Sequence, residues 1–238
     1  MKLKLSVAVL ATLATLAGLP AMAKPAPLNT LTRAERQAGW TLLFDGKDLK
    51  GWRLYKGGAA DGKWAAENGA LALKGTGGAN IVSDAEYGDF ELSLEWKISK
   101  GGNSGIMYFV RELPADDEPY QTGPEMQVLD NAGHADGKIP SHTAGAIYDL
   151  VTPSADVTRP VGQWNVARIV VKKGHIEHWL NGTKVAESSY GDDAWKALVA
   201  ASKFKSMPDF ARTPIGRICL QDHGDPVWFR NIKIRRLG

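Results

Sequence analysis

A short segment, residues 123–130, carries the side chains of this chain that are best placed to do acid–base chemistry. It reads Gly-Pro-Glu-Met-Gln-Val-Leu-Asp. If the segment is a strand, Glu125 and Gln127 project from one face and apolar residues from the other, because alternate side chains share a face. A bulge near Leu129 would bring Asp130 to the same side. A carboxylate beside an amide on an apolar-backed strand is typical of sugar-processing sites, although an ordinary amphipathic strand gives the same pattern.

Three other segments place polar side chains inside or at the end of strand patterns. The Gly-rich residues 101–105 lead into an apolar run, and period two predicts one shared face for Asn103, Gly105, Met107, Phe109 and Arg111. Glycines beside a strand let a ligand or another backbone approach closely. Polar strand ends form the rims of many ligand pockets. The further candidates from these segments are Asn103, Arg111, His142, Tyr148, Gln221 and His223.

Several kinds of site are not indicated by the sequence. The five histidines show no metal-ligand spacing, and neither a Gly-rich nucleotide loop nor a Gly-x-Ser-x-Gly motif is present. We therefore expect neither a cofactor nor a metal. Cys219 is the only cysteine and lies in a strand pattern, so neither an intramolecular disulfide, a disulfide-linked partner nor a thiol nucleophile is expected.

The N-terminal 23 residues have the pattern of a cleavable signal peptide. Lys2 and Lys4 precede an apolar stretch, and Ala21-Met22-Ala23 is a small-x-small cleavage site. The sequence thus predicts a periplasmic or secreted protein that starts at Lys24. Loss of the two lysines leaves 27 basic against 26 acidic residues, a net charge of +1. Nothing in this balance favours nucleic-acid or membrane partners.

The rest of the chain reads as short strands joined by turns. Residues 24–37 form a lead-in with a helical turn capped at Thr32, and residues 38–238 form one domain. Strands are expected from residue 40 onward, including one at 144–151, and the first is expected to pair with the last, at 227–234. Only residues 192–204 have helical periodicity. This pattern predicts an all-β fold, a jelly-roll β-sandwich of two antiparallel sheets with one short helix.

Seven motifs follow one another in order along the chain. They lie at residues 43–52, 101–106, 123–130, 162–165, 178–182, 202–204 and 220–232. Together they resemble the family of 3-keto-disaccharide hydrolases, formerly a domain of unknown function in the concanavalin A-like lectin and glucanase superfamily. The resemblance implies a jelly roll that binds a small carbohydrate on its concave sheet. It also adds Lys203, in the sixth motif, to the predicted substrate-binding residues.

The chemistry of such a substrate can be argued from its ketone. A ketone at sugar C3 acidifies the proton on C2, so a base can form an enolate, the C1 oxygen can leave, and water can add back. This route needs a base, an acid for the leaving group and donors for the enolate oxygen. The predicted catalytic residues are Glu125, Asp130 and His223. The predicted substrate-binding residues are Asn103, Arg111, Gln127, His142, Tyr148, Lys203 and Gln221.

Two alternatives stay open at the level of sequence. The spacing Glu-x-Gln-x-x-Asp also resembles the Glu-x-Asp-x-x-Glu signature of laminarinase-type glycosidases, which implies direct displacement by two carboxylates. Gln127 stands in place of the middle carboxylate and cannot ionise, which weakens that analogy. A carbohydrate-binding protein without catalysis, or a structural exported domain, would use the same sandwich but would not need an ionisable cluster.

Overall fold

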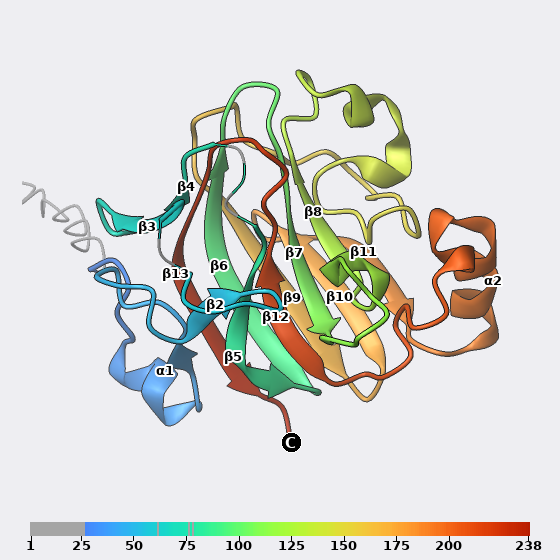
Figure 1. Cartoon of the computed structure of the whole chain (residues 1–238), viewed down its shortest axis with the longest axis horizontal. Coiled ribbons are helices and arrows are strands. Elements are labelled where there is room, and N and C mark those ends of the chain that lie inside the picture. Colours follow the sequence, from blue (N-terminus) through green and yellow to red (C-terminus); the bar gives the residue numbers. More distant parts are fainter. Residues whose placement is uncertain (1–26, 61, 76, 78) are drawn as a thin grey trace, which may run out of the picture.

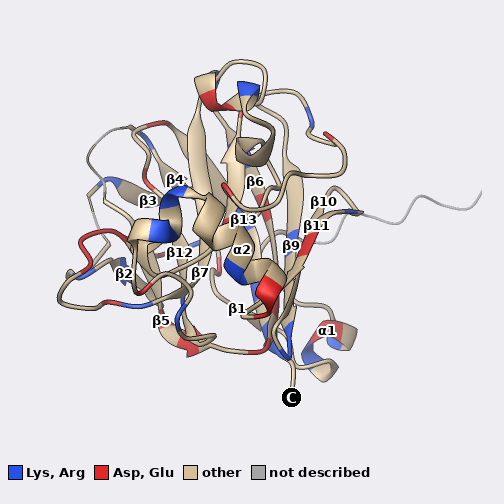
Figure 2. Cartoon of the chain, turned by 90° about the vertical axis from the view of Figure 1, so that its right-hand side faces the viewer, with Lys and Arg blue, Asp and Glu red and all other residues tan. Residues whose placement is uncertain are grey.

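The computed structural model describes residues 27–238 except 61, 76 and 78; the predicted signal peptide lies outside the described residues. In this part of the chain the strands form two antiparallel sheets, one of eight strands and one of five, which pack face to face (Figure 1). Turned by 90°, the molecule shows β2, β5, β7 and β12 in one layer and β6, β9, β10, β11 and β13 in the other (Figure 2). The predicted jelly-roll sandwich is confirmed.

The bounds of the elements follow the chain. The strands are β1 (Thr41–Leu42), β2 (Trp52–Leu54), β3 (Trp64–Glu67), β4 (Ala70–Leu73), β5 (Ile81–Tyr87), β6 (Phe90–Ile98), β7 (Asn103–Val110), β8 (Glu125–Leu129), β9 (Asn165–Lys172), β10 (His175–Leu180), β11 (Thr183–Ser189), β12 (Gly216–Leu220) and β13 (Val227–Arg236). The helices are α1 (Arg33–Gln37), α2 (Asp193–Ala201) and the 3-10 turns η1 (Pro119–Gln121), η2 (Ala135–Lys138), η3 (Pro140–His142) and η4 (Lys203–Ser206).

The order of strands in each sheet shows how the two layers are built. The eight-stranded sheet runs β11-β10-β9-β6-β13-β4-β3, with β1 beside β13, and the five-stranded sheet runs β2-β5-β12-β7-β8. The first strand therefore pairs with the last, as the sequence predicts. Apolar residues at every second position of β6 point between the layers, and they are Phe90, Leu92, Leu94, Trp96 and Ile98.

The segment before the first strand is bonded to the sandwich. Thr32 and Glu35 cap α1 reciprocally, as the sequence indicates. Asn29 is buried, and it exchanges two hydrogen bonds with Asn231, where its backbone nitrogen donates at 2.6 Å and its Oδ1 accepts at 2.8 Å. The lead-in is thus attached to the sheet from residue 29 onward. Of the described helices, none has the length and apolar character needed to cross a bilayer.

Two expectations about strands are wrong, and both concern the edge near β8. Residues 144–151 form turns with isolated bridges at Ile147. Gly145 and Asp149 have φ of +91° and +57°, which interrupts an extended chain. The segment still bonds to β8, because the backbone nitrogen of Tyr148 donates to the carbonyl of Glu125 at 3.0 Å. An irregular segment therefore covers the edge of β8 and carries Tyr148 with it.

The second correction concerns the end of β7. Phe109 has φ of +60°, and the pairing of β12 with β7 shifts register between Arg217 and Cys219. Because of this irregularity, Phe109 does not share a face with Met107 but turns into the core between the sheets. Simple alternation therefore fails to place the residues that follow, including Arg111.

Candidate active site

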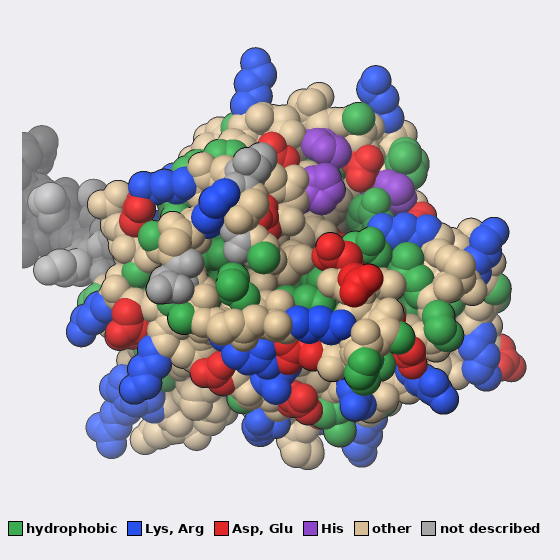
Figure 3. Space-filling view, in the orientation of Figure 1, with side chains coloured by type: hydrophobic (Ala, Val, Ile, Leu, Met, Phe, Trp, Pro, Cys, Tyr) green, Lys and Arg blue, Asp and Glu red, His purple; other side chains and the backbone are tan. Residues whose placement is uncertain are grey.

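A cavity of about 250 Å³ lies on the face of the five-stranded sheet that points away from the core. Figure 3 looks onto this side of the molecule and shows histidine side chains gathered together on it. Strands β7 and β8 and the residue that follows β12 supply part of its wall, and loops supply the rest. The lining residues are Asn103, Tyr120, Glu125, Gln127, Tyr148, Lys203, Gln221 and His223.

The pairing of β7 with β8 brings the predicted strand residues together. Gly105 stands opposite Gln127, and Met107 stands opposite Glu125, in a regular antiparallel register. Residues directly opposite one another share a face, so the polar side chains of both strands project to the same side. On the next strand, the backbone nitrogen of Gln221 donates to the carbonyl of Gly105 at 3.0 Å, which sets the end of β12 beside them.

Gly105 leaves the space that the Glu125 carboxylate occupies. A Cβ added to Gly105 would lie 1.9 Å from Oε1 of Glu125 and 2.5 Å from its carboxyl carbon. No side chain can be placed there without moving the carboxylate. The glycine in this strand is therefore required by a close approach within the site.

Glu125 is a desolvated carboxyl group. Its side chain is 4 % exposed, and it makes no hydrogen bond or ion pair with the described residues. Burial raises the pKa of Glu125 to about 8, while the nearby ammonium of Lys203 lowers it and the carboxylate of Asp136 raises it. A carboxyl group with a pKa near neutrality can exchange protons in either direction at physiological pH.

Two amide side chains in the cavity present unpartnered oxygens. Oδ1 of Asn103 and Oε1 of Gln221 are buried without a hydrogen-bond partner in the described structure. Gln127 differs, because its Oε1 accepts from the backbone nitrogen of Val128 at 3.2 Å. That bond fixes the amide and leaves its NH₂ group to donate elsewhere. Buried polar atoms normally have partners, so the two oxygens indicate a ligand whose hydroxyl groups donate to them, and the NH₂ of Gln127 can donate to an oxygen of the same ligand.

Lys203 and Tyr148 form one wall of the cavity. The Lys203 ammonium lies 4.4 Å from the ring centroid of Tyr148 and 5.1 Å from that of Tyr120. It has no carboxylate within ion-pair distance among the described residues. His142 stacks on Tyr148 with centroids 4.3 Å apart, so the ammonium must cover the opposite face of the ring. Tyr148 therefore has no free face on which a sugar could stack.

Three predicted site residues lie outside this cavity. Both carboxylate oxygens of Asp130 accept from backbone nitrogens, of Gly101 at 2.7 Å and Gly133 at 3.1 Å. No bulge interrupts the pairing of β8 with β7, and Asp130 follows the strand as a loop anchor. Arg111 is exposed beyond the irregular end of β7, and His142 stands behind Tyr148. The other predicted residues line the cavity together.

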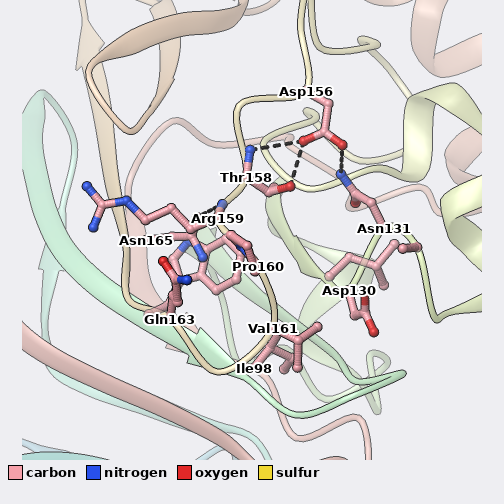
Figure 4. Close-up of a pocket in the computed structure, with 13 residues that line it drawn as sticks. Ile98, Asp130, Asn131, Asp156, Thr158, Arg159, Pro160, Val161, Gln163 and Asn165 are labelled. Carbon is pink, nitrogen blue, oxygen red and sulfur yellow. Dashed lines mark hydrogen bonds between the residues drawn. The ribbon is translucent and has the colours of Figure 1, made fainter.

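A larger hollow of about 370 Å³ lies at the end of the sandwich, and Asp130 is part of its wall (Figure 4). Asp156 also lines this hollow, and its carboxylate accepts from Thr158 Oγ1 at 2.6 Å and from Asn131 Nδ2 at 3.1 Å. Trp96 also lines this hollow, and its ring nitrogen is buried without a partner. Burial opposes the ionisation of Asp156, but hydrogen bonds from Thr158 and Asn131 outweigh this and lower its pKa. In the smaller cavity burial raises the pKa of Glu125 instead, so the smaller cavity is the candidate active site.

The sequence did not single out two residues that shape the site. Tyr120 lies in η1, between the strands, where no periodicity marks it. Asp136 accepts from the hydroxyl of Tyr148 at 3.4 Å. Burial, followed by the charges of Asp136 and Glu125, raises the pKa of Tyr148 well above its usual range. Only the folding of the loops over β8 brings these residues to the cavity.

A group on β10 and β11 has the composition of a metal site, and it consists of the exposed His175 and Glu187 and the half-buried Glu177. Both carboxylates are already paired with Lys184, whose ammonium lies 3.5 Å from Glu177 and 2.5 Å from Glu187. The group stands on the other sheet and takes no part in the cavity.

The fold and the cavity define a β-sandwich whose polar pocket is suited to a hydroxylated ligand. A family model for the 3-keto-alpha-glucoside-1,2-lyase-like domain matches residues 39–235. The chain belongs to this family.

Two relatives illustrate the similarity. A protein of Bacteroides thetaiotaomicron named 3-keto-disaccharide hydrolase is 36 % identical, over 90 % of this chain and 84 % of its own length. A crystal structure of a proposed glycosyl hydrolase from Parabacteroides distasonis has a TM-score of 0.84 at 36 % identity. That comparison covers 89 % of this chain and all of the other. A second structure from the same organism has a TM-score of 0.64 at 30 % identity, over 83 % of this chain and 99 % of the other.

Proposed function

We propose that this protein is a glycoside hydrolase that acts on 3-keto-glycosides or 3-keto-disaccharides by elimination and rehydration. The observation that carries the proposal is the unpartnered carboxyl group of Glu125, buried in a cavity that also holds unpartnered amide oxygens. The name of the Bacteroides relative supports the same class of substrate.

Glu125 is the base in this proposal. It removes the proton from C2, and the electron pair of the C–H bond moves to form the enolate with its negative charge on the C3 oxygen. The ammonium of Lys203, held beside aromatic rings and without a carboxylate partner among the described residues, stabilises that charge. The NH₂ of Gln127 is a second donor for the substrate.

The leaving group departs at the rim. The enolate collapses, the bond between C1 and the glycosidic oxygen breaks, and His223 donates a proton to the departing oxygen. His223 is exposed and lines the cavity, so the leaving alcohol can pass directly to solvent. Water then adds to C1 of the unsaturated sugar and gives up one proton to His223, while C2 regains a proton from Glu125. The net reaction is hydrolysis, and both residues return to their starting protonation states.

Direct displacement fits this cavity less well. It needs two carboxyl groups about 5–10 Å apart on either side of the scissile bond. Glu125 is the one carboxyl group among the described lining residues, because Gln127 is an amide and Asp130 lies elsewhere. A purely sugar-binding role also fits less well. Both faces of Tyr148 are covered, and a buried carboxyl group without a partner would only weaken such a site.

Export accompanies this activity in our proposal. Residues 1–23 have the sequence pattern of a cleavable signal peptide, which supports a location in the periplasm or outside the cell.

The decisive experiment compares 3-keto disaccharides with their unoxidised forms and follows the products by mass spectrometry. We expect turnover of the keto forms alone, since only they have an acidified C2 proton. Deuterium at C2 should slow the reaction about two- to sixfold where proton removal limits the rate. Equal rates on both forms, with no isotope effect, would rule out elimination.

A further inference from the structure

Asp149 links two segments that meet at the cavity. Its carboxylate Oδ1 accepts from Nε2–H of His142 at 3.1 Å, and its Oδ2 accepts from the backbone nitrogen of Lys203 at 2.8 Å. Asp149 and Lys203 are 54 residues apart in the sequence. The side chain therefore ties the loop over β8 to η4.

The two residues that Asp149 holds are stacked against the same ring. His142 packs on one face of Tyr148 at 4.3 Å, and the ammonium of Lys203 lies over the other at 4.4 Å. The hydroxyl of Tyr148 donates to Asp136 at 3.4 Å. These contacts close a ring of interactions in which Tyr148 and Lys203 face the cavity and Asp149 does not.

Lys203 has a long, flexible side chain, so its ammonium must be held in place if it is to stabilise charge in the cavity. The residue is exposed, and its ammonium has no carboxylate within ion-pair distance among the described residues. A lysine side chain in that situation has many accessible rotamers. Stabilisation of a developing negative charge requires a positive group that is already in place. The backbone of Lys203 must therefore be fixed relative to Tyr148.

We propose that Asp149 is a positioning residue that holds the Lys203 ammonium against Tyr148 and so fixes the cationic wall of the cavity. This rests on the proposed function, in which Lys203 faces the enolate oxygen. Asp149 acts through its neighbours, because both of its oxygens are engaged and it does not line the cavity. Its φ of +57° lies in the left-handed region, immediately after Tyr148.

Two substitutions separate the carboxylate contacts from the backbone geometry. Asp149→Gly removes both acceptors and accepts the left-handed φ without strain. Asp149→Asn also tolerates this φ, and its amide can accept from Lys203 and donate to the other tautomer of His142. We expect Asp149→Gly to lower kcat on the keto substrate about tenfold, with KM changed less than about threefold. Asp149→Asn should restore most of kcat.

A matched control lies on the other sheet. Both oxygens of Asp89 accept from the backbone nitrogen of Lys173, at 3.0 and 2.9 Å, so Asp89→Gly also removes a carboxylate that anchors a turn. We expect this variant to lose stability and to keep the kcat of the wild type.

A second readout does not depend on turnover. Brief acylation with acetic anhydride, followed by mass spectrometry of the peptide that contains Lys203, reports how firmly its amine is held. We expect labelling to rise about threefold in Asp149→Gly and to stay at the wild-type level in Asp149→Asn and Asp89→Gly. Wild-type labelling and kcat in Asp149→Gly, or equal defects in the Asn and Gly variants, would overturn the positioning role. If the wild type fails to turn over keto sugars, the proposed function fails, and the labelling still decides the role of Asp149.

Discussion

The acidic side chains on the outer faces of β6 and β8 have opposite surroundings. On the eight-stranded sheet, Glu91 accepts from Arg168 at 2.5 Å and from Arg235 at 2.7 Å, and Glu95 accepts from Arg230 at 2.8 Å. On the five-stranded sheet, Glu125 has no such partner among the described residues. A face whose charges are paired within the protein contributes to stability and solubility. A face whose buried polar groups lack partners is prepared for a ligand.

Lysine side chains that lie over aromatic rings also have different neighbours on the two sheets. On the eight-stranded sheet, Lys97 lies 4.5 Å from the ring of Trp228 and 5.1 Å from that of Trp164. Lys97 shares the outer face of β6 with Glu91 and Glu95. Lys203 also stands over aromatic rings, but it shares its surface with the unpartnered Glu125. The same residue types therefore serve different purposes because their neighbours differ.

The largest expected effect comes from exchanging carboxyl for amide on each face. Glu125→Gln keeps the shape of the side chain but removes the base, so turnover of the keto substrate should fall at least about a hundredfold. Glu95→Gln alters a paired group on the other sheet and should leave turnover unchanged. Steady-state rates of both variants test this difference in turnover, and circular dichroism checks that both variants are folded. An active Glu125→Gln enzyme would refute the assignment of the base.

Glu125 and Glu91, on the two faces, should also make the free energy of unfolding depend on pH in opposite directions. Burial raises the pKa of Glu125 to about 8, so the native state binds more protons than the unfolded state between about pH 4.5 and 8. Stability is thus lost as the pH rises through this range, and Glu125→Gln should gain roughly 2 kcal/mol relative to wild type at pH 8. Denaturant unfolding at pH 5 and pH 8 measures this difference.

Glu91 is the control, because its pKa is shifted in the opposite direction from that of Glu125. Burial opposes its ionisation, but hydrogen bonds from Arg168 and Arg235 outweigh this and lower its pKa below the usual range. Its contribution is present above about pH 4.5 and is lost as the pH falls through the lowered value. Glu91→Gln should therefore cost about 1–2 kcal/mol at pH 8. Loss of stability in both variants at pH 8 would contradict the contrast between the faces.

A smaller effect is expected from filling the space beside the unpartnered carboxylate. Gly105→Ala places a Cβ where Oε1 of Glu125 now lies, so the carboxylate must move and turnover should fall about tenfold. Gly58→Ala is the control, since a Cβ there meets no atom within 4 Å. Kinetics and unfolding curves of both variants test this. Normal turnover in Gly105→Ala would show that the position of Glu125 is not critical.

Local sequence patterns specified most of the sandwich. Period two in β6 fixed which residues enter the core, and the capping pair of Thr32 and Glu35 marked the start of α1. The same alternation put Glu125 and Gln127 on one face of β8, a face that the structure shows lining a cavity. These features are readable because strand periodicity and helix capping act over a few residues.

Tertiary structure alone decided what surrounds those two side chains. The register of β7 against β8 placed Gly105 beside Glu125, and the left-handed residues Gly145 and Asp149 turned an expected strand into the loop that carries Tyr148. Desolvation of Glu125 depends on that covering, and so does its raised pKa. The burial and pairing of a side chain depend on residues that are distant in the sequence, so a local sequence pattern cannot predict them. The sequence determined which groups can do chemistry, and the packing of loops over β8 decided which of them lack partners.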